Sequence, residues 1–185
     1  MLQQFERMAP SFTSSLPVDR WEVLAIAQHH GLPTRLLDWT YNPYVAAWFT
    51  VGRPPRPGQG PGVVWIHVPA SADYVTSKER VRSPLELRRT DSNRPLVFEP
   101  RFITSRIRAQ DGVFTVHSFN VRQQRFLPID EYGSHRECMT KVIIPSDAFT
   151  DMADELNYVG VNAASLFPDL DGLSRKIMDD FTAWE

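Results

Sequence analysis

The sequence predicts an α+β fold: a single domain with a central mixed or antiparallel sheet and helices at both ends. Helical patterns lie near both ends of the chain, whereas β-branched and alternating runs lie in its middle. Strands and helices do not alternate regularly, as they would in a doubly wound fold. A chain of 185 residues has the length of one domain, and 42% hydrophobic residues are enough to build a core.

The first elements have clear start and stop signals. Residues 2–8 predict a short helix that ends before Pro10. Asp19 is a candidate N-cap for a second helix that runs to about His30, and Gly31 fits its C-terminal stop. Pro33 favours extended backbone, so residues 35–39 are expected to form a short strand. The pair Asn42-Pro43 then opens an apolar helix over residues 44–51.

The rest of the chain is predicted as follows. Residues 52–62 form a Pro/Gly-rich loop that we expect to be flexible. Residues 70–95 are ambiguous, with short helical turns and an Arg-rich loop, and residues 120–136 are expected to be a surface segment. Strands are expected at residues 63–68, 96–98, 113–119 and 139–144. Helices are expected at residues 146–158 and 169–184, with a helix or turn at residues 101–110.

Composition narrows the classes of function. The net charge of -2 argues against nucleic-acid binding, although Arg80, Arg82, Arg88, Arg89, Arg94 and Arg101 cluster in the middle third. We interpret that cluster mainly as a solvated surface. A single cysteine, Cys138, agrees with a cytoplasmic location and is expected to be a packed thiol. No membrane span, signal peptide or metal-ligand spacing is predicted.

One short stretch holds most of the side chains that could bind a ligand or take part in catalysis. Residues 28–40 read Q-H-H-G-L-P-T-R-L-L-D-W-T, in which polar and apolar side chains are interleaved. The chemically capable residues in it are His29, His30, Thr34, Arg35, Asp38 and Thr40. Arg35 and Asp38 are also compatible with a buried structural ion pair, and His29 with a simple helix C-terminal contact.

This stretch, followed by Asn42-Pro43 and an apolar helix, resembles the central signature of the FRG domain family, which is named for a Phe-Arg-Gly motif. Two further segments resemble the same family: residues 106–115, and residues 165–173, which read S-L-F-P-D-L-D-G-L. The Phe-Arg-Gly motif itself is missing here, so we expect a chain truncated at its N-terminus relative to the family. The resemblance implies a bacterial or phage origin and a role in conflict or defence.

The order of these motifs is similar to that of ADP-ribosyltransferases, which implies NAD as the cofactor. In that interpretation His29, Asp38 and Gln110 are the catalytic candidates, since Gln110 or His29 would position the ribose and Asp38 would stabilise positive charge. Arg35, Thr34, Thr40 and Arg106 are the cofactor-binding candidates, with arginine suited to phosphate and threonine to a ribose hydroxyl.

Two other classes remain open. One is a non-catalytic module that senses a nucleotide or binds a protein target of bacterial or phage origin. The other is a toxin that acts on nucleic acid, which the net charge and the lack of a carboxylate cluster disfavour. A metal at Asp169 and Asp171 is a weaker prediction than a turn with a helix cap.

Overall fold

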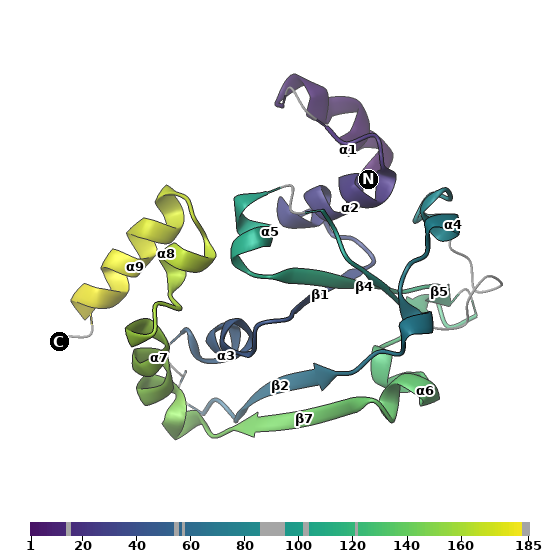
Figure 1. The fold of residues 1–185 in the computed structure, drawn as a ribbon. Helices are drawn as coiled ribbons and strands as arrows, with labels where there is room; N and C mark the ends of the chain where they lie inside the picture. Colours follow the sequence, from purple (N-terminus) through teal and green to yellow (C-terminus); the bar gives the residue numbers. More distant parts are fainter. Residues whose placement is uncertain are drawn as a thin grey trace. The chain divides into compact units, whose positions relative to one another are not determined.

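The computed structural model describes residues 1–13, 16–53, 56, 58–85, 95–101, 104–120 and 122–182. Its helices and small antiparallel sheets confirm the α+β class (Figure 1). Within these residues the strands form a three-stranded sheet and two two-stranded sheets, where the sequence predicted one central sheet. The described chain forms two compact units, each assembled from three separate stretches of sequence.

Unit 1 comprises Met1–Trp39, Val68–Ile103 and Val113–Cys138. Its helices are α1 (Leu2–Met8), α2 (Arg20–His29), α4 (Ser77–Arg80) and α6 (Gly133–Arg136), with short 3-10 turns η1 (Ala9–Ser11), η2 (Ser71–Asp73) and η3 (Ile129–Glu131). Its strands are β1 (Leu36–Thr40), β3 (Leu96–Phe98), β4 (Gly112–Val116), β5 (Phe119–Asn120) and β6 (Arg125–Phe126). The last residue of β1 and the first of β4 are assigned to the other unit.

Strand β4 is the middle strand of the sheet in unit 1, in the order β1-β4-β3. The helix α2 begins where the Asp19 carboxylate accepts the Trp21 backbone N–H, and it ends before Gly31, whose φ of 82° favours glycine. Trp21 and Phe98 are fully buried, with ring centroids 5.3 Å apart, so helix and sheet share one apolar core.

Unit 2 comprises Thr40–His67, Thr104–Gly112 and Met139–Glu185. Its elements are α3 (Pro43–Val51), β2 (Gly62–His67), α5 (Ser105–Ala109), β7 (Met139–Ile144), η4 (Ser146–Ala148), α7 (Phe149–Tyr158), α8 (Ala163–Leu166) and α9 (Leu170–Thr182). In Figure 1, β2 and β7 run side by side as a long antiparallel ribbon.

The core of unit 2 is separate from that of unit 1. Trp48 of α3, Phe149 of α7 and Leu166 of α8 are among its buried members. Gly172 in α9 sits so close to Phe167 that an added Cβ would lie 1.9 Å from the Phe167 carbonyl oxygen. This close approach seats α9 on α8.

Several boundaries match the sequence prediction, and some predictions are wrong. The bounds of α1, β3 and β7 agree with it, whereas α8 is an additional helix. Residues 120–136 are not merely a surface segment, because Ile129, Tyr132 and His135 are buried. Cys138 is exposed instead of packed, since it lies in the turn between α6 and β7. Part of the loop at 52–62 lies outside the described residues.

Candidate functional site

The connection between α2 and β1 is organised by Gln28. Its Oε1 accepts the Thr34 hydroxyl at 2.6 Å, and its Nε2 donates to Asp38 Oδ2 at 2.8 Å and to the Leu36 carbonyl at 3.4 Å. The Thr34 hydroxyl oxygen also accepts the Leu36 N–H at 2.9 Å. We call Gln28, Thr34 and Asp38 the α2–β1 cluster. It closes the chain reversal around Gly31 with side-chain hydrogen bonds.

The α2–β1 cluster uses most of its hydrogen-bonding capacity within the protein. Both the donor and the acceptor of the Thr34 hydroxyl have partners in the loop. Asp38 is exposed, and its described contact is with Gln28 and not with Arg35, so the proposed buried ion pair is not formed. The other Asp38 oxygen, Oδ1, has no partner among the described residues.

His29 and Arg35 occupy the two sides of this connection. His29 is half-buried in the last turn of α2, edge-on to the exposed ring of His30, with ring centroids 4.8 Å apart. Arg35 is half-buried, donates through Nη1 to the Pro84 carbonyl at 3.0 Å and lies 5.8 Å from the Phe126 ring centroid. Burial lowers the pKa of the Arg35 guanidinium, which is still protonated at neutral pH because arginine titrates so far above it.

A buried polar chain starts at Trp39. The Trp39 indole N–H donates to Thr115 Oγ1 at 3.0 Å, and Thr115 Oγ1 lies 2.9 Å from His117 Nε2. His117 Nδ1 lies 3.0 Å from the Leu127 carbonyl oxygen, which can only accept. His117 must therefore carry its proton on Nδ1, and the Thr115 hydroxyl donates to Nε2.

The pKa of His117 is lowered, chiefly because the ring is buried, with a smaller contribution from nearby His135. The hydrogen bond to Leu127 opposes this shift but does not cancel it. In the neutral ring Nε2 accepts the Thr115 hydroxyl, and protonation of Nε2 would take this acceptor from the hydroxyl hydrogen. His117, which directly follows β4, is therefore interpreted as a structural residue.

In unit 2, Thr40 joins the end of β1 to the turn between α5 and β4. Its hydroxyl donates to the Gln110 carbonyl at 2.7 Å, and its oxygen accepts the Asn42 N–H at 3.0 Å. The Tyr41 N–H donates to the Asp111 carbonyl at 3.1 Å. The Thr40 hydroxyl thus both donates and accepts, and it holds the backbone of Gln110, while the Tyr41 N–H holds that of Asp111.

Arg106 and Gln110 lie four residues apart and both reach the same segment of unit 2. The Arg106 guanidinium carbon lies 4.3 Å from the Phe167 ring centroid, a cation–π contact. Gln110 Nε2 donates to the Leu166 carbonyl at 3.1 Å. Because i and i+4 positions share a face, α5 presents both side chains to the end of α8.

The α5–β4 turn keeps hydrogen-bonding groups that the described residues do not use. These are the guanidinium N–H groups of Arg106, Oε1 of Gln110 and the carboxylate of Asp111. All three residues are half-buried, and we call them the α5–β4 cluster. Asp111 also has a φ of 47°, a left-handed conformation that non-glycine residues adopt rarely and that recurs at functional sites.

The sequence did not single out Gln28, Asp111 or Phe167. Gln28 and Phe167 could have been found only as motif neighbours, because their partners are six or more residues away. Asp111-Gly112 is a turn dipeptide, which was a usable signal for the special backbone at Asp111.

Other predicted features have structural explanations. Asp169 accepts the Gly172 N–H through Oδ1, as expected for a helix cap. Of the clustered arginines, Arg88, Arg89 and Arg94 lie outside the described residues, and Arg80 pairs with the α2 N-cap Asp19 and with Glu22. Within the described ranges, none of the helices combines the length and apolar character that a membrane crossing requires.

The comparison with family models agrees with the motif. The chain is an α+β protein whose residues 1–58 match the FRG domain model, which confirms the resemblance of residues 28–40 and of the helix after them. The matched range includes α1, α2, β1 and α3, whereas the two later segments lie beyond it. No curated protein and no solved structure matches the chain.

Proposed function

We propose that this FRG-domain chain binds NAD through the α5–β4 cluster of unit 2, as an ADP-ribosyltransferase-like module. The observation that carries the proposal is the pair Arg106 and Gln110, which both contact the Leu166–Phe167 segment while the Arg106 N–H groups and Gln110 Oε1 have no described partner. The sequence order of the motifs favours NAD among nucleotides.

The chemistry of each group suits one part of a dinucleotide. Arg106 carries up to five N–H donors in a plane that the Phe167 ring holds in place, which favours a pyrophosphate oxygen. Gln110 Oε1 and the Asp111 carboxylate are acceptors, and ribose hydroxyls are donors that carboxylates bind in other dinucleotide sites. We therefore assign phosphate to Arg106 and ribose to Gln110 and Asp111.

The same set defines the proposed reaction. Loss of nicotinamide breaks the bond between its nitrogen and ribose C1′, and the nitrogen keeps the electron pair. Positive charge then builds on the ribose, and a nearby carboxylate stabilises it. Water or a target nucleophile attacks C1′ and loses a proton. Asp111 is the carboxylate that the α5–β4 cluster provides. The roles that the sequence predicted for His29, Arg35 and Asp38, which belong to unit 1, are not part of this proposal.

Thr34 and Thr40 are left out of the proposed ligand set. Their hydroxyl donors and acceptors are used within the protein, so neither has a donor left for a ribose. In this proposal both threonines position neighbouring backbone, and Thr40 does so for Gln110.

The test is a thermal-unfolding titration with NAD, followed by mass spectrometry for free nicotinamide. Arg106→Gln removes the charge, and Arg108→Gln is the matched control, because Arg108 is exposed on the same helix. We expect NAD to raise Tm in the wild type and in Arg108→Gln, with a much smaller shift in Arg106→Gln.

The outcomes separate the classes of function. A Tm shift with nicotinamide release supports a transferase or hydrolase, and a shift without release supports a non-catalytic nucleotide-binding module. A wild-type chain whose Tm does not respond to millimolar NAD would refute the proposal, as would an equal response in Arg106→Gln.

A further inference from the structure

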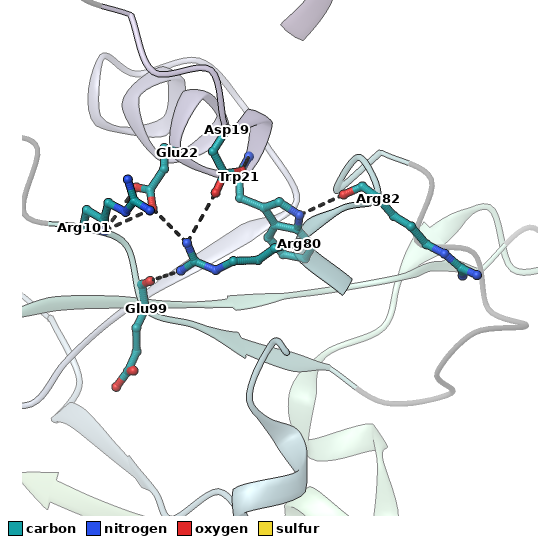
Figure 2. Close-up of polar contacts among 7 residues, drawn as sticks. All are labelled: Asp19, Trp21, Glu22, Arg80, Arg82, Glu99 and Arg101. Carbon is teal, nitrogen blue, oxygen red and sulfur yellow. Dashed lines mark hydrogen bonds and ion pairs between the residues drawn. The ribbon is translucent and has the colours of Figure 1, made fainter. Parts of the chain in front are cut away.

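Unit 1 contains a cleft of about 800 Å³ that is distinct from the NAD site proposed for unit 2. It lies beside the start of α2 and the segment that follows α4. Most of its lining residues are charged or polar, namely Asp19, Arg20, Glu22, Arg80, Arg82, Ser83 and Arg101. Figure 2 shows the Arg80 side chain reaching Asp19 and Glu22 along this wall.

The two acids of the cleft are fully occupied by protein donors. Glu22 is only 1% exposed, and its two oxygens accept the Arg101 backbone N–H at 3.2 and 3.1 Å. Arg80 Nη1 lies 3.3 Å from Glu22 Oε1 and 3.3 Å from Asp19 Oδ2, while Asp19 Oδ1 accepts the Trp21 N–H (Figure 2). These carboxylates therefore have little capacity left to bind a cation.

Two arginines of the cleft, Arg80 and Arg20, also have partners within the protein. Arg80 Nη2 donates to the Glu99 carbonyl at 2.7 Å, and its guanidinium carbon lies 5.1 Å from the Phe98 ring centroid. Arg20 pairs with Glu6 through two hydrogen bonds of 2.7 and 2.8 Å. Both guanidinium groups are therefore fixed by protein acceptors, and we do not include them among the proposed ligand-binding groups.

What the cleft retains is hydrogen-bond donors. The Ser83 hydroxyl oxygen accepts from Arg20 Nη1 at 3.2 Å and from the Leu85 N–H at 3.3 Å, so its lone pairs are used. Ser83 is 8% exposed, and its hydroxyl hydrogen has no described acceptor. The Arg101 guanidinium, which is exposed, likewise forms none of the side-chain contacts described for this unit.

The hydrogen-bond acceptors of this wall already have partners, whereas the Ser83 O–H and the Arg101 guanidinium are donors without a described acceptor. Such a surface is complementary to an anion. The lining holds four arginines against two acids, Asp19 and Glu22, and the exposed guanidinium of Arg101 is the positive group that faces no described acid. We propose that this cleft binds a phosphate group, either free or carried by a small metabolite, through Arg101 and the Ser83 hydroxyl.

Phosphate fits these donors for a geometric reason. Its oxygens accept several hydrogen bonds at once, so one oxygen can take the Ser83 O–H while others take the planar Arg101 fork. The Trp21 indole N–H, which is buried, donates to the carbonyl of the lining residue Arg82 at 3.0 Å and gives the site a spectroscopic reporter.

The test is a phosphate titration of the ¹⁵N-labelled chain at constant ionic strength, with chloride as the reference anion. The readouts are the Arg101 backbone amide and the Trp21 indole N–H. Arg101→Gln and Ser83→Ala remove the proposed donors, and Arg136→Gln is the matched control, an exposed arginine on α6. Equal melting temperatures establish that Arg101→Gln is folded.

We expect saturable shifts with phosphate, at least tenfold weaker binding in Arg101→Gln, a few-fold loss in Ser83→Ala and no change in Arg136→Gln. Methyl phosphate identifies the source, since binding at least as tight as that of inorganic phosphate assigns a phosphomonoester and weaker binding assigns free phosphate. Shifts that chloride reproduces, or that Arg101→Gln leaves intact, would overturn the proposal. Such a failure would not affect the NAD proposal, which depends on Arg106 in unit 2.

Discussion

The α2–β1 cluster and the α5–β4 cluster are both rich in polar side chains, but they use them differently. In the first, Gln28 connects Thr34 and Asp38 in a closed set of hydrogen bonds. In the second, Arg106 and Gln110 contact Phe167 and Leu166 and keep most of their donors or acceptors unoccupied.

The difference shows that a dense motif is not by itself a ligand site. A reversal from helix to strand leaves backbone groups without partners, and the Gln28 and Thr34 side chains supply those partners to Leu36. The α5–β4 turn obtains its backbone partners from Thr40 and Tyr41, so its own side chains are left for another use.

The largest expected effect comes from Gly172→Ala, which breaks the support of the α5–β4 cluster. The added Cβ would meet the Phe167 carbonyl at 1.9 Å and the Ala163 carbonyl at 2.8 Å, so α9 or α8 must move. We expect a loss of about 3 kcal/mol in the free energy of unfolding, together with weaker NAD binding. Urea denaturation measures the loss. Gly133→Ala, where a Cβ meets nothing within 4 Å, is the control.

Gln28→Ala should have the next largest effect, this time on the α2–β1 cluster. The change removes three described hydrogen bonds, so we expect a loss of about 2 to 3 kcal/mol. Urea denaturation of this variant and of Gln123→Ala, at an exposed position, tests the value. A difference below about 0.5 kcal/mol would show that the cluster contributes little to the fold.

His117→Gln tests whether the polar interior of unit 1 depends on a neutral ring. We expect a loss of about 1 to 2 kcal/mol at pH 7, since the bonds to Thr115 and Leu127 are disturbed. Because the folded-state pKa of His117 lies below its ordinary value of 6.5, the unfolded chain takes up the proton first as pH falls. The wild type therefore loses stability below pH 6.5, and its advantage over the variant narrows.

That pH dependence is measured by urea denaturation between pH 5 and 8, conditions that we choose to bracket the ordinary histidine pKa of about 6.5. His30→Gln serves as the control, because His30 is exposed. A gap between wild type and His117→Gln that widens on acidification would contradict the neutral-ring assignment.

Asp111→Asn should have the smallest effect on stability. The Asp111 carboxylate has no described partner, and asparagine tolerates the left-handed backbone at φ 47°. We expect a change within about 0.5 kcal/mol, whereas Asp111→Ala should cost about 1 kcal/mol more. Thermal and urea unfolding provide both values. If Asp111→Asn is as damaging as Gln28→Ala, the carboxylate is structural and the contrast between the clusters fails.

Local signals predicted the secondary structure well where capping and β-branched runs were present. Asp19 and Asn42 cap α2 and α3 as expected, and β7 has the predicted bounds. The helix α8 was missed because it is a four-residue helix with no periodic pattern to detect. The burial of His135 and Tyr132 in a polar segment depends on tertiary packing, which local sequence does not encode.

The candidate site could be predicted only in part. The sequence identified Arg106, Gln110, Thr40 and Asp38 by residue type, but hydrogen bonds decide which of their atoms are free to bind a ligand. From the motif alone, Thr34 and Thr40 were candidates for ligand binding. In the structure their hydroxyls form hydrogen bonds within the protein. Asp111 was overlooked because its role follows from a backbone angle.

The central claim is that affinity resides in the α5–β4 cluster and stability in the α2–β1 cluster. Calorimetric titration with NAD of Arg106→Gln and Gln28→Ala, at a temperature where both are folded, tests it most directly. We predict at least a tenfold loss of affinity in Arg106→Gln, about 1.4 kcal/mol, and less than about a twofold loss in Gln28→Ala. Intact binding in Arg106→Gln with lost binding in Gln28→Ala would contradict the claim.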